Sequence, residues 1–293
     1  MRLAAVDVGT NSCRLLIAEA IGGKLSTILK ETVTTRLGEG QQDSGWLRPS
    51  AINRTLDCLL DFQALIKAHR VSAYRIIATS AVREAANRED FQAIIEEAGI
   101  KLDIVDGKEE ALLSHLGVER SLQFSQPPLV IDVGGGSTEF ICPGDPFTVK
   151  TLPVGAVKAT EGDWSAGEIW SKLREGLALR EEIRDHPMVM VGGTPTTLVA
   201  IKESLAEYDA EMVHGHILTR PEVEDLYAML DGMPLNLRRR LPGLQPERAD
   251  IVVKGTLIIL LIMEGLQKKE ITVSESDLLE GIIWQLAASG NRR

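Results

Sequence analysis

The sequence predicts an α/β protein of two domains. Strand-like and helix-like segments alternate along its 293 residues, which is typical of sheets covered by helices. An apolar hairpin pattern at 3–20 recurs at 129–141, and a polar connection with two prolines, 123–128, directly precedes the second hairpin. We therefore predict an N-terminal domain at 1–125 and a C-terminal domain at 126–293.

The elements of the first half follow hydrophobic periodicity and its breaks. In the helix expected at 87–98, Phe91, Ile94 and Ile95 share one face. Asn87 can cap its N-terminus, and Gly99 can end it. In chain order after the first hairpin, we predict a helix at 50–70, a strand at 74–80, this helix, a strand at 101–107 and a helix from 108 onward.

The second half continues the alternation. After its hairpin, we predict a helix at 164–184, a strand at 188–192, helices at 221–230 and 246–266, a strand at 270–274 and a helix from 277 onward. The apolar run 251–265 is interrupted by Lys254 and is shorter than the ~20 residues of a spanning helix, so we expect a buried core helix and no membrane partner. We expect the C-terminal helix 277–293 to be able to pack back on the first domain.

Composition narrows the class of protein. The net charge of −10, without a long acidic run, argues against a general nucleic-acid-binding or membrane-binding surface. Cys13, Cys58 and Cys142 form an odd set without Cys-x-x-Cys spacing, which excludes a full disulfide framework and a cysteine zinc site. Asp7 and Gly9 interrupt the apolar N-terminus where a secretory signal would continue, so we expect a cytoplasmic protein.

The two hairpins differ in one facing pair. If each turn consists of the two residues after Asp-Val-Gly, Asp7 faces Arg14 in the first hairpin, whereas Asp132 faces Glu139 in the second. Two facing carboxylates destabilise a hairpin unless a proton or a cation lies between them. Mg²⁺ binds carboxylates together with phosphate oxygens, and glycines let backbone N–H groups approach phosphate. The pattern favours a metal and phosphate site, although the two turns alone could also be unrelated.

Seven segments carry a resemblance to a known family: DVGTNSCRLLI, ATSAVREAANREDF, KEEALLSHLGV, LVIDVGGGSTEFI, LPVGAVKATEGDW, VGGTPTTLVAI and ERADIVVKGTLIIL. Together they are similar, nearly end to end, to the exopolyphosphatase/guanosine pentaphosphate phosphohydrolase family of the acetate kinase, Hsp70 and actin superfamily, in its short two-domain form. The resemblance implies two ribonuclease-H-like domains of the actin-like ATPase type with the active site in the interdomain cleft. It also implies hydrolysis, with Mg²⁺ or Mn²⁺, of the terminal phosphoryl group of inorganic polyphosphate or guanosine pentaphosphate.

The resemblance also implies roles for the residues of the two hairpins. Asp7, Asp132 and Glu139 would surround the metal ion. The phosphate-binding residues would be Gly9, Thr10, Asn11, Ser12, Arg14, Gly134, Gly135, Gly136, Ser137 and Thr138. Arg14 could instead pair with Asp7, and both alternatives stay open.

Two residues outside the hairpins match the family's catalytic groups. Glu110 matches the glutamate that would orient and deprotonate the attacking water, although Glu109 could take the same role. Arg83 matches a phosphate-contacting arginine that would stabilise charge on the transferring phosphoryl group. Leu279 departs from the pattern, because many members have an arginine here within Gly-Leu-Arg-Glu-Gly, and the effect of this replacement is open.

Other polar features of the sequence indicate a function less specifically. His214 and His216 alternate as strand residues do, and we expect them to be structural or to line the substrate site. The basic clusters at 238–240 and 268–269 are either solvated faces or guides for a long phosphate chain. The turn at 192–198 could present free N–H groups to an anion.

Two functions of other classes compete with hydrolysis. A small-molecule kinase would use the same turns to transfer phosphate to a hydroxyl group, and a nucleotide sensor would bind without catalysis. The intact acids and Glu110 favour hydrolysis by water over both. Polyphosphate and guanosine pentaphosphate offer the same terminal phosphoanhydride, so the choice between them is open, as are the preferred metal and a homodimeric assembly.

Overall fold

The computed structural model describes residues 1–144 and 147–290, and the chain divides into two compact units. Unit 1 contains Met1–Gly117 together with Asp277–Arg293, and unit 2 contains Val118–Ser276.

The chain passes from unit 1 to unit 2 inside a helix. Helix α5 extends over Gly107–Ser121, and the units divide within it, whereas the prediction placed the boundary after residue 125. The connection at 123–128 has no regular secondary structure, as predicted. Because the helix is continuous across the division, the change in composition marks the end of α5 and not the edge of the compact unit.

Unit 1 contains a five-stranded sheet in the order β3-β2-β1-β4-β5. Its strands are β1 (Arg2–Val8), β2 (Cys13–Ile21), β3 (Lys24–Val33), β4 (Ala73–Ala78) and β5 (Asp103–Ile104). β1 pairs antiparallel with β2 and parallel with β4, and β5 extends the sheet in parallel. The hairpin predicted at 3–20 is therefore confirmed, whereas the strand predicted at 101–107 is only two residues long.

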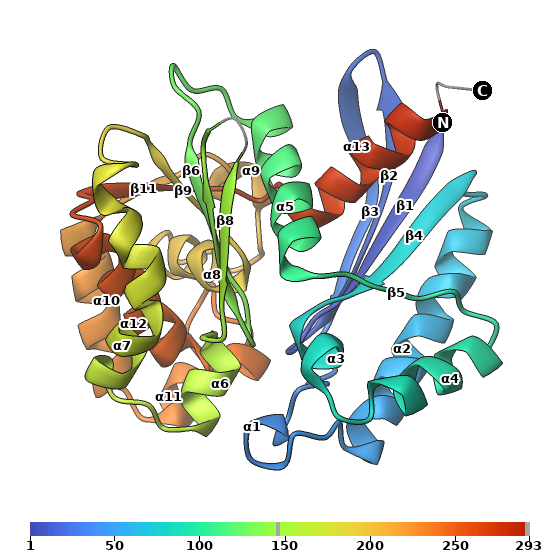
Figure 1. Cartoon of the computed structure of the whole chain (residues 1–293), viewed down its shortest axis with the longest axis horizontal. Helices are drawn as coiled ribbons and strands as arrows, with labels where there is room; N and C mark the ends of the chain where they lie inside the picture. Colours follow the sequence, from blue (N-terminus) through green and yellow to red (C-terminus); the bar gives the residue numbers. More distant parts are fainter. Residues whose placement is uncertain (145–146, 291–293) are drawn as a thin grey trace. The chain divides into compact units, whose positions relative to one another are not determined.

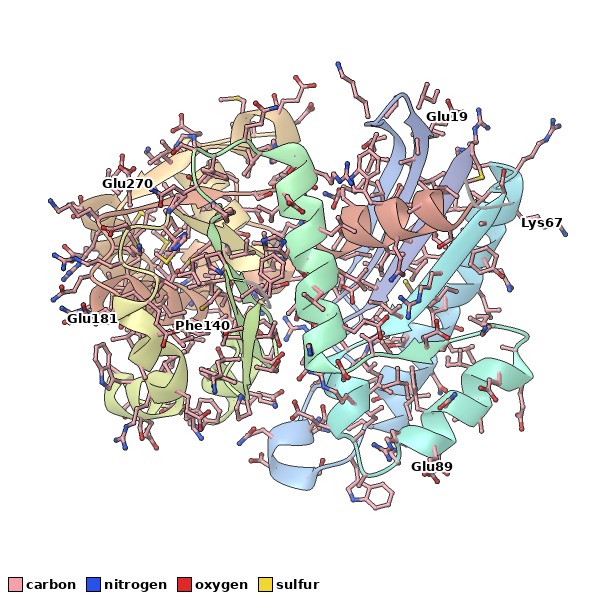
Figure 2. All side chains as sticks on the ribbon, turned by 45° about the horizontal axis from the view of Figure 1, so that its top comes forward. Glu19, Lys67, Glu89, Phe140, Glu181 and Glu270 are labelled. Carbon is pink, nitrogen blue, oxygen red and sulfur yellow. The ribbon has the colours of Figure 1, made fainter. Side chains whose placement is uncertain are left out.

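Both faces of β1 are buried, because its residues are apolar on both sides. Val6 packs in one core with helix α2 (Pro49–Ala68), and Ala5 packs in a second core with helix α13 (Leu278–Gly290). Figures 1 and 2 show α13 lying across the strands of this sheet. Because side chains alternate along a strand, Asp7 lies on the face that α13 covers.

The other helices of unit 1 are α1 (Gln41–Ser44), α3 (Ser80–Glu84), α4 (Arg88–Glu97) and the part of α5 up to Gly117. Asn87 precedes α4, but the prediction that its side chain caps the helix is wrong. Its amide instead accepts a hydrogen bond from the Leu47 N–H (2.9 Å) and donates one to the Leu47 carbonyl (3.0 Å). The side chain therefore joins two loops that are far apart in the sequence.

Unit 2 contains a six-stranded sheet in the order β10-β11-β9-β6-β7-β8. Its strands are β6 (Leu129–Val133), β7 (Thr138–Cys142), β8 (Thr148–Leu152), β9 (Met188–Val191), β10 (Ile217–Thr219) and β11 (Glu270–Val273). β6 pairs antiparallel with β7 and parallel with β9, so β6 to β9 repeat the arrangement of β1 to β4. The predicted α/β class with a repeated half is confirmed.

The helices of unit 2 are α6 (Ala156–Glu161), α7 (Ala166–Leu177), α8 (Gly193–Lys202), α9 (Ala210–Val213), α10 (Arg220–Gly232), α11 (Leu235–Arg238) and α12 (Val252–Gly265). Short 3-10 turns lie at Ala178–Glu181 and Pro246–Arg248. α12 is the predicted core helix, and its apolar residues pack in one cluster with Phe140, which Figure 2 labels. Within 1–144 and 147–290, no helix combines the length and apolar character that a membrane crossing needs.

Candidate active site

The first hairpin has the predicted register. Asp7 lies opposite Arg14, and Val8 lies opposite Cys13. The turn is closed by a hydrogen bond from the Gly9 N–H to the Ser12 carbonyl (3.1 Å). The register that brings Asp7 and Arg14 together is therefore confirmed.

The carbonyl groups of this first turn are bound from one side. The N–H of Gly38 donates to the Thr10 carbonyl (2.9 Å), and the N–H of Arg36 donates to the Asn11 carbonyl (2.8 Å). In a trans peptide the carbonyl and the following N–H point in opposite directions. The N–H groups of Asn11 and Ser12 therefore point away from the 36–38 loop, as an anion-binding turn requires.

The second hairpin repeats this geometry in unit 2. Asp132 lies opposite Glu139, as predicted, and the Gly134 N–H donates to the Ser137 carbonyl (3.0 Å). Both carboxylate side chains are at least nine-tenths buried. Buried like charges on facing strand positions need a compensating charge, which is the condition that predicted a cation near this pair.

Helix α6 holds the carbonyl groups of the second turn. The Ala156 N–H donates to the Gly134 carbonyl and the Val157 N–H donates to the Gly135 carbonyl, each at 2.9 Å. Residue 155 must be glycine for this approach, because a Cβ there would lie 2.5 Å from the Gly135 oxygen. The N–H groups of Gly135 and Gly136 consequently point to the opposite side, as the N–H groups of the first turn do.

Thr138 differs from the other predicted phosphate-binding residues. Its side chain is fully buried, and its hydroxyl donates to the Val154 carbonyl (2.6 Å). This hydroxyl binds the loop between β8 and α6, so a phosphate contact through its proton would require this bond to break.

A buried charge network follows the first turn on the α13 side of the sheet. Arg14 donates through Nε (3.0 Å) and Nη2 (2.8 Å) to Oδ2 of Asp7, and through Nη1 to Oδ2 of Asp277. Oδ1 of Asp7 is buried and has no hydrogen-bond partner among the described residues. An acceptor oxygen of this kind fits a hard cation, which prefers carboxylate ligands.

The two carboxylates of this network differ in their proton affinity. Burial raises the pKa of Asp7, and Arg14 only partly offsets this effect. Burial also acts to raise the pKa of Asp277, but Arg14 and Lys30 outweigh it and lower that pKa. The guanidinium of Arg14 is held charged between them, because the two carboxylates outweigh its own burial and raise its pKa.

Glu109 and Glu110 have separate environments. Glu110 is 8% exposed and accepts a hydrogen bond from Nη1 of Arg83 (2.9 Å). The side chain of Glu109 is 41% exposed and pairs with Nη2 of Arg75 (2.8 Å). Nη2 of Arg83 is buried and donates to no residue that the structure describes, so it can bind an additional anion.

The candidate residues of unit 1 follow neighbouring strand ends. The turn 9–12 follows β1, Arg83 follows β4, and Glu110 follows β5. In the parallel register, Val8 lies beside Ala78, which lies beside Ile104 of the next strand. The carboxyl ends of these strands meet at one edge of the sheet, where ligands of open α/β sheets bind.

The three predicted metal-binding acids are divided between the units. Asp7 belongs to unit 1, and Asp132 and Glu139 belong to unit 2. Within the described ranges, no group of three His, Cys, Asp or Glu side chains forms a cluster that could hold a metal ion. The three-acid metal site therefore stays a prediction.

Several other polar residues have structural partners. Nδ1 of His214 accepts from the Glu275 N–H (3.2 Å), and Nε2 of His216 lies 3.1 Å from Nζ of Lys202. The ammonium of Lys268 donates to the carbonyls of Ile183, Arg184 and His186, and Arg238 donates to those of Met233 and Ala249. Lys268 and Arg238 thus stabilise loops, which argues against their guiding a phosphate chain.

Two residues near the turns were not identified from the sequence. Asp277 binds Arg14. Arg248 lies close to Gly193, because a Cβ added at Gly193 would be 2.0 Å from Nη1 of Arg248. The sequence did contain a signal for Asp277. When the motif Gly-Leu-Arg-Glu-Gly is aligned so that Leu279 stands at its arginine, Asp277 stands at its first glycine. Leu279 itself is fully buried in the core under α13, a place that suits leucine and not an arginine charge.

Comparisons with known proteins find a family and several similar proteins. The family model for the Ppx/GppA phosphatase family matches residues 16–289. The chain is 33% identical to exopolyphosphatase 2 of Mycobacterium tuberculosis, covering 98% of each. It is 27% identical to the guanosine-5'-triphosphate,3'-diphosphate pyrophosphatase of Aeromonas salmonicida, covering 97% of this chain and 60% of that protein.

Two further similarities extend the comparison. A bifunctional 3-dehydroquinate synthase/phosphatase of Fusobacterium nucleatum is 32% identical over 96% of this chain, which spans only 46% of that longer protein. The crystal structure of the Aquifex aeolicus member of the Ppx/GppA family superposes with a TM-score of 0.79 at 30% identity, covering 99% of both chains. The predicted two-domain actin-like fold is confirmed by this similarity, and the chain belongs to the Ppx/GppA phosphatase family.

Proposed function

We propose that this protein removes the terminal phosphoryl group of inorganic polyphosphate, and of guanosine pentaphosphate, with Mg²⁺ or Mn²⁺ bound. The reaction class, phosphoanhydride hydrolysis, follows from membership of the family. The two substrates are proposed because the similar proteins include a named exopolyphosphatase and a named guanosine pentaphosphate pyrophosphatase. The metal is proposed because a polyanionic substrate needs charge compensation and the acids suit a hard cation.

The observation that carries the proposal is the doubled turn. In each turn, a glycine N–H donates to the carbonyl of the serine three positions later. Backbone N–H groups of a neighbouring loop or helix bind two carbonyls of the turn. The N–H groups of each turn therefore point away from those bonds, where they can donate to phosphate oxygens. Two such turns of one construction suit a substrate that is a chain of phosphates.

In the proposed reaction, Glu110 takes a proton from water while the water oxygen forms a bond to the terminal phosphorus. The phosphoanhydride bond breaks, inorganic phosphate leaves, and the shortened chain retains the electrons of that bond. Nη2 of Arg83 donates to the developing charge on the phosphoryl group, and Nη1 keeps Glu110 in place. Asp7, Asp132 and Glu139 would hold a divalent cation, which would supply further charge compensation when bound.

Phosphate release from three substrates tests the proposal. Long polyphosphate, short polyphosphate and guanosine pentaphosphate are each incubated with the protein and Mg²⁺, and free phosphate is measured over time. We expect release from at least one polyphosphate and from guanosine pentaphosphate, and loss of release when the metal is chelated. Release from none of them, with Mg²⁺ or with Mn²⁺, would overturn the proposed function.

A further inference from the structure

We propose that Asp277 is a positioning residue of the first turn. In this proposal it holds the Arg14 guanidinium, and Arg14 holds one oxygen of Asp7 so that the other stays available to a cation. This rests on the proposed function only in assigning Asp7 to the metal. The assignment concerns a residue far from the turn in the sequence, at the point where the chain returns to unit 1.

The hydrogen bonds of Arg14 have an unequal arrangement. Nε and Nη2 both donate to Oδ2 of Asp7, at 3.0 and 2.8 Å, so Oδ1 of the same carboxylate receives none of them. An arginine free at Nη1 can move to the side-by-side pairing in which both carboxylate oxygens are bound. Asp277 binds Nη1 and so opposes that movement. Oδ1 of Asp7 then remains without a partner among the described residues.

Asp277 is itself fixed by the start of helix α13. Its Oδ1 accepts from the Leu279 N–H (3.2 Å), and its own N–H donates to Oε2 of Glu280 (2.9 Å). These reciprocal bonds cap the helix, and the side chain of Leu279 is fully buried in the core against the sheet. The acceptor that holds Arg14 is therefore anchored to the core of unit 1.

The same position contacts the helix that carries Glu110. A Cβ at Gly117 of α5 would lie 2.0 Å from the carbonyl oxygen of Asp277, so the backbone of Asp277 lies directly against α5. Both residues belong to unit 1. Asp277 thus connects the carboxylate of Asp7 to the helix of the proposed general base.

The charges of the network favour a cation. Two carboxylates, Asp7 at 5% exposure and Asp277 at 4%, share one guanidinium. Lys30 pairs beside them with Glu280 (3.3 Å), so the five charges together still leave one negative charge, and a buried excess charge is costly unless it is compensated. Asp277 could therefore also act through its charge alone, without positioning Arg14, and the test must separate the two effects.

A double-mutant cycle on Mn²⁺ binding makes this separation. Free Mn²⁺ is measured by electron paramagnetic resonance, without substrate, for the wild type, Asp277→Asn, Arg14→Gln and the double variant. Asparagine still accepts the Leu279 N–H, so α13 should keep its cap. We expect Asp277→Asn to weaken Mn²⁺ binding about tenfold in the wild-type background, and less than about twofold when Arg14→Gln is already present.

The controls make each outcome decisive. Asp103→Asn removes a carboxylate that pairs with another arginine of unit 1, Arg75 at 3.0 Å, and should leave Mn²⁺ binding unchanged. Equal weakening by Asp277→Asn in both backgrounds would mean that charge alone acts, and it would overturn the positioning role. Unchanged binding in Asp277→Asn, or a wild type that binds no Mn²⁺, would overturn it as well. Because no substrate is present, absence of hydrolysis with an intact cycle would refute only the proposed function.

Discussion

Replacing Glu110 with glutamine should abolish most turnover and leave the fold intact. If Glu110 is the general base, its loss lowers turnover by ~10²–10⁴-fold, which corresponds to about 2.7–5.5 kcal/mol in the activation barrier. The effect on stability is smaller, because the glutamine oxygen can still accept the Arg83 hydrogen bond of 2.9 Å. Exchanging a charged acceptor for a neutral one costs about 1 kcal/mol.

The neighbouring acid provides a matched control. Glu109→Gln makes the same chemical change one position away, in a side chain that is 41% exposed and paired with Arg75. An exposed pair of this kind contributes at most about 1 kcal/mol to stability. Because Glu109 pairs with Arg75, whereas Arg83 binds Glu110, we expect turnover within about twofold of the wild type.

The assay is steady-state phosphate release on the best substrate, combined with urea unfolding of all three proteins. Unfolding separates a lost base from a damaged fold, because both variants should unfold within about 1 kcal/mol of the wild type. Similar turnover losses in the two variants, or a loss confined to Glu109→Gln, would refute the assignment of Glu110.

Three further predictions concern metal binding, packing and pH. Mg²⁺ at 100 times its dissociation constant should stabilise the wild type by roughly 2.7 kcal/mol, and Asp132→Asn should lose much of this gain. Thermal unfolding at fixed ionic strength measures this stabilisation. Equal Mg²⁺-induced shifts in the wild type and in Asp132→Asn would mean that Asp132 is not a metal ligand. Gly281→Ala should lower the free energy of unfolding by about 1–3 kcal/mol, measured in urea, because its Cβ would lie 1.9 Å from the Leu113 oxygen; an unchanged midpoint would contradict this packing. The hydrogen bond from Lys202 lowers the pKa of Glu222 from 4.5 to about 2, so its contribution to stability is complete above pH 4.5 and is lost as the pH falls toward 2. Glu222→Gln should flatten that part of the stability curve, and an unaltered curve would show that the pair has no such effect.

The local geometry of both hairpins could be predicted from the sequence. Asp7 and Arg14 are seven positions apart, and so are Asp132 and Glu139, so the period of two and a short turn were sufficient to place each pair. The buried helix α12 was predicted for a similar reason, because its apolar run is continuous. Such features depend on neighbours in the chain.

The edge strands were harder to predict. β3 is mostly exposed, and β8 is exposed or half-buried except at Leu152, so neither has a strong apolar signal. Both pair with a hairpin strand that is itself buried, and that pairing makes them strands. Asn87 shows the same limit, because a partner 40 residues away, Leu47, determines the orientation of its side chain.

The sequence by itself determined the α/β class, the repeated turns and the register of each hairpin, and it predicted the acids of the candidate site. Only the tertiary structure gave Glu110 and Glu109 their different arginine partners, Arg83 and Arg75. It also brought Asp277 to Arg14 across 263 positions of the chain. The physical reason is that side chains repeat with a fixed period along a strand or a helix, so residues close together in the sequence are enough to reveal it. A buried charge instead needs a partner, and this partner can come from any segment that the order of strands and helices places beside it.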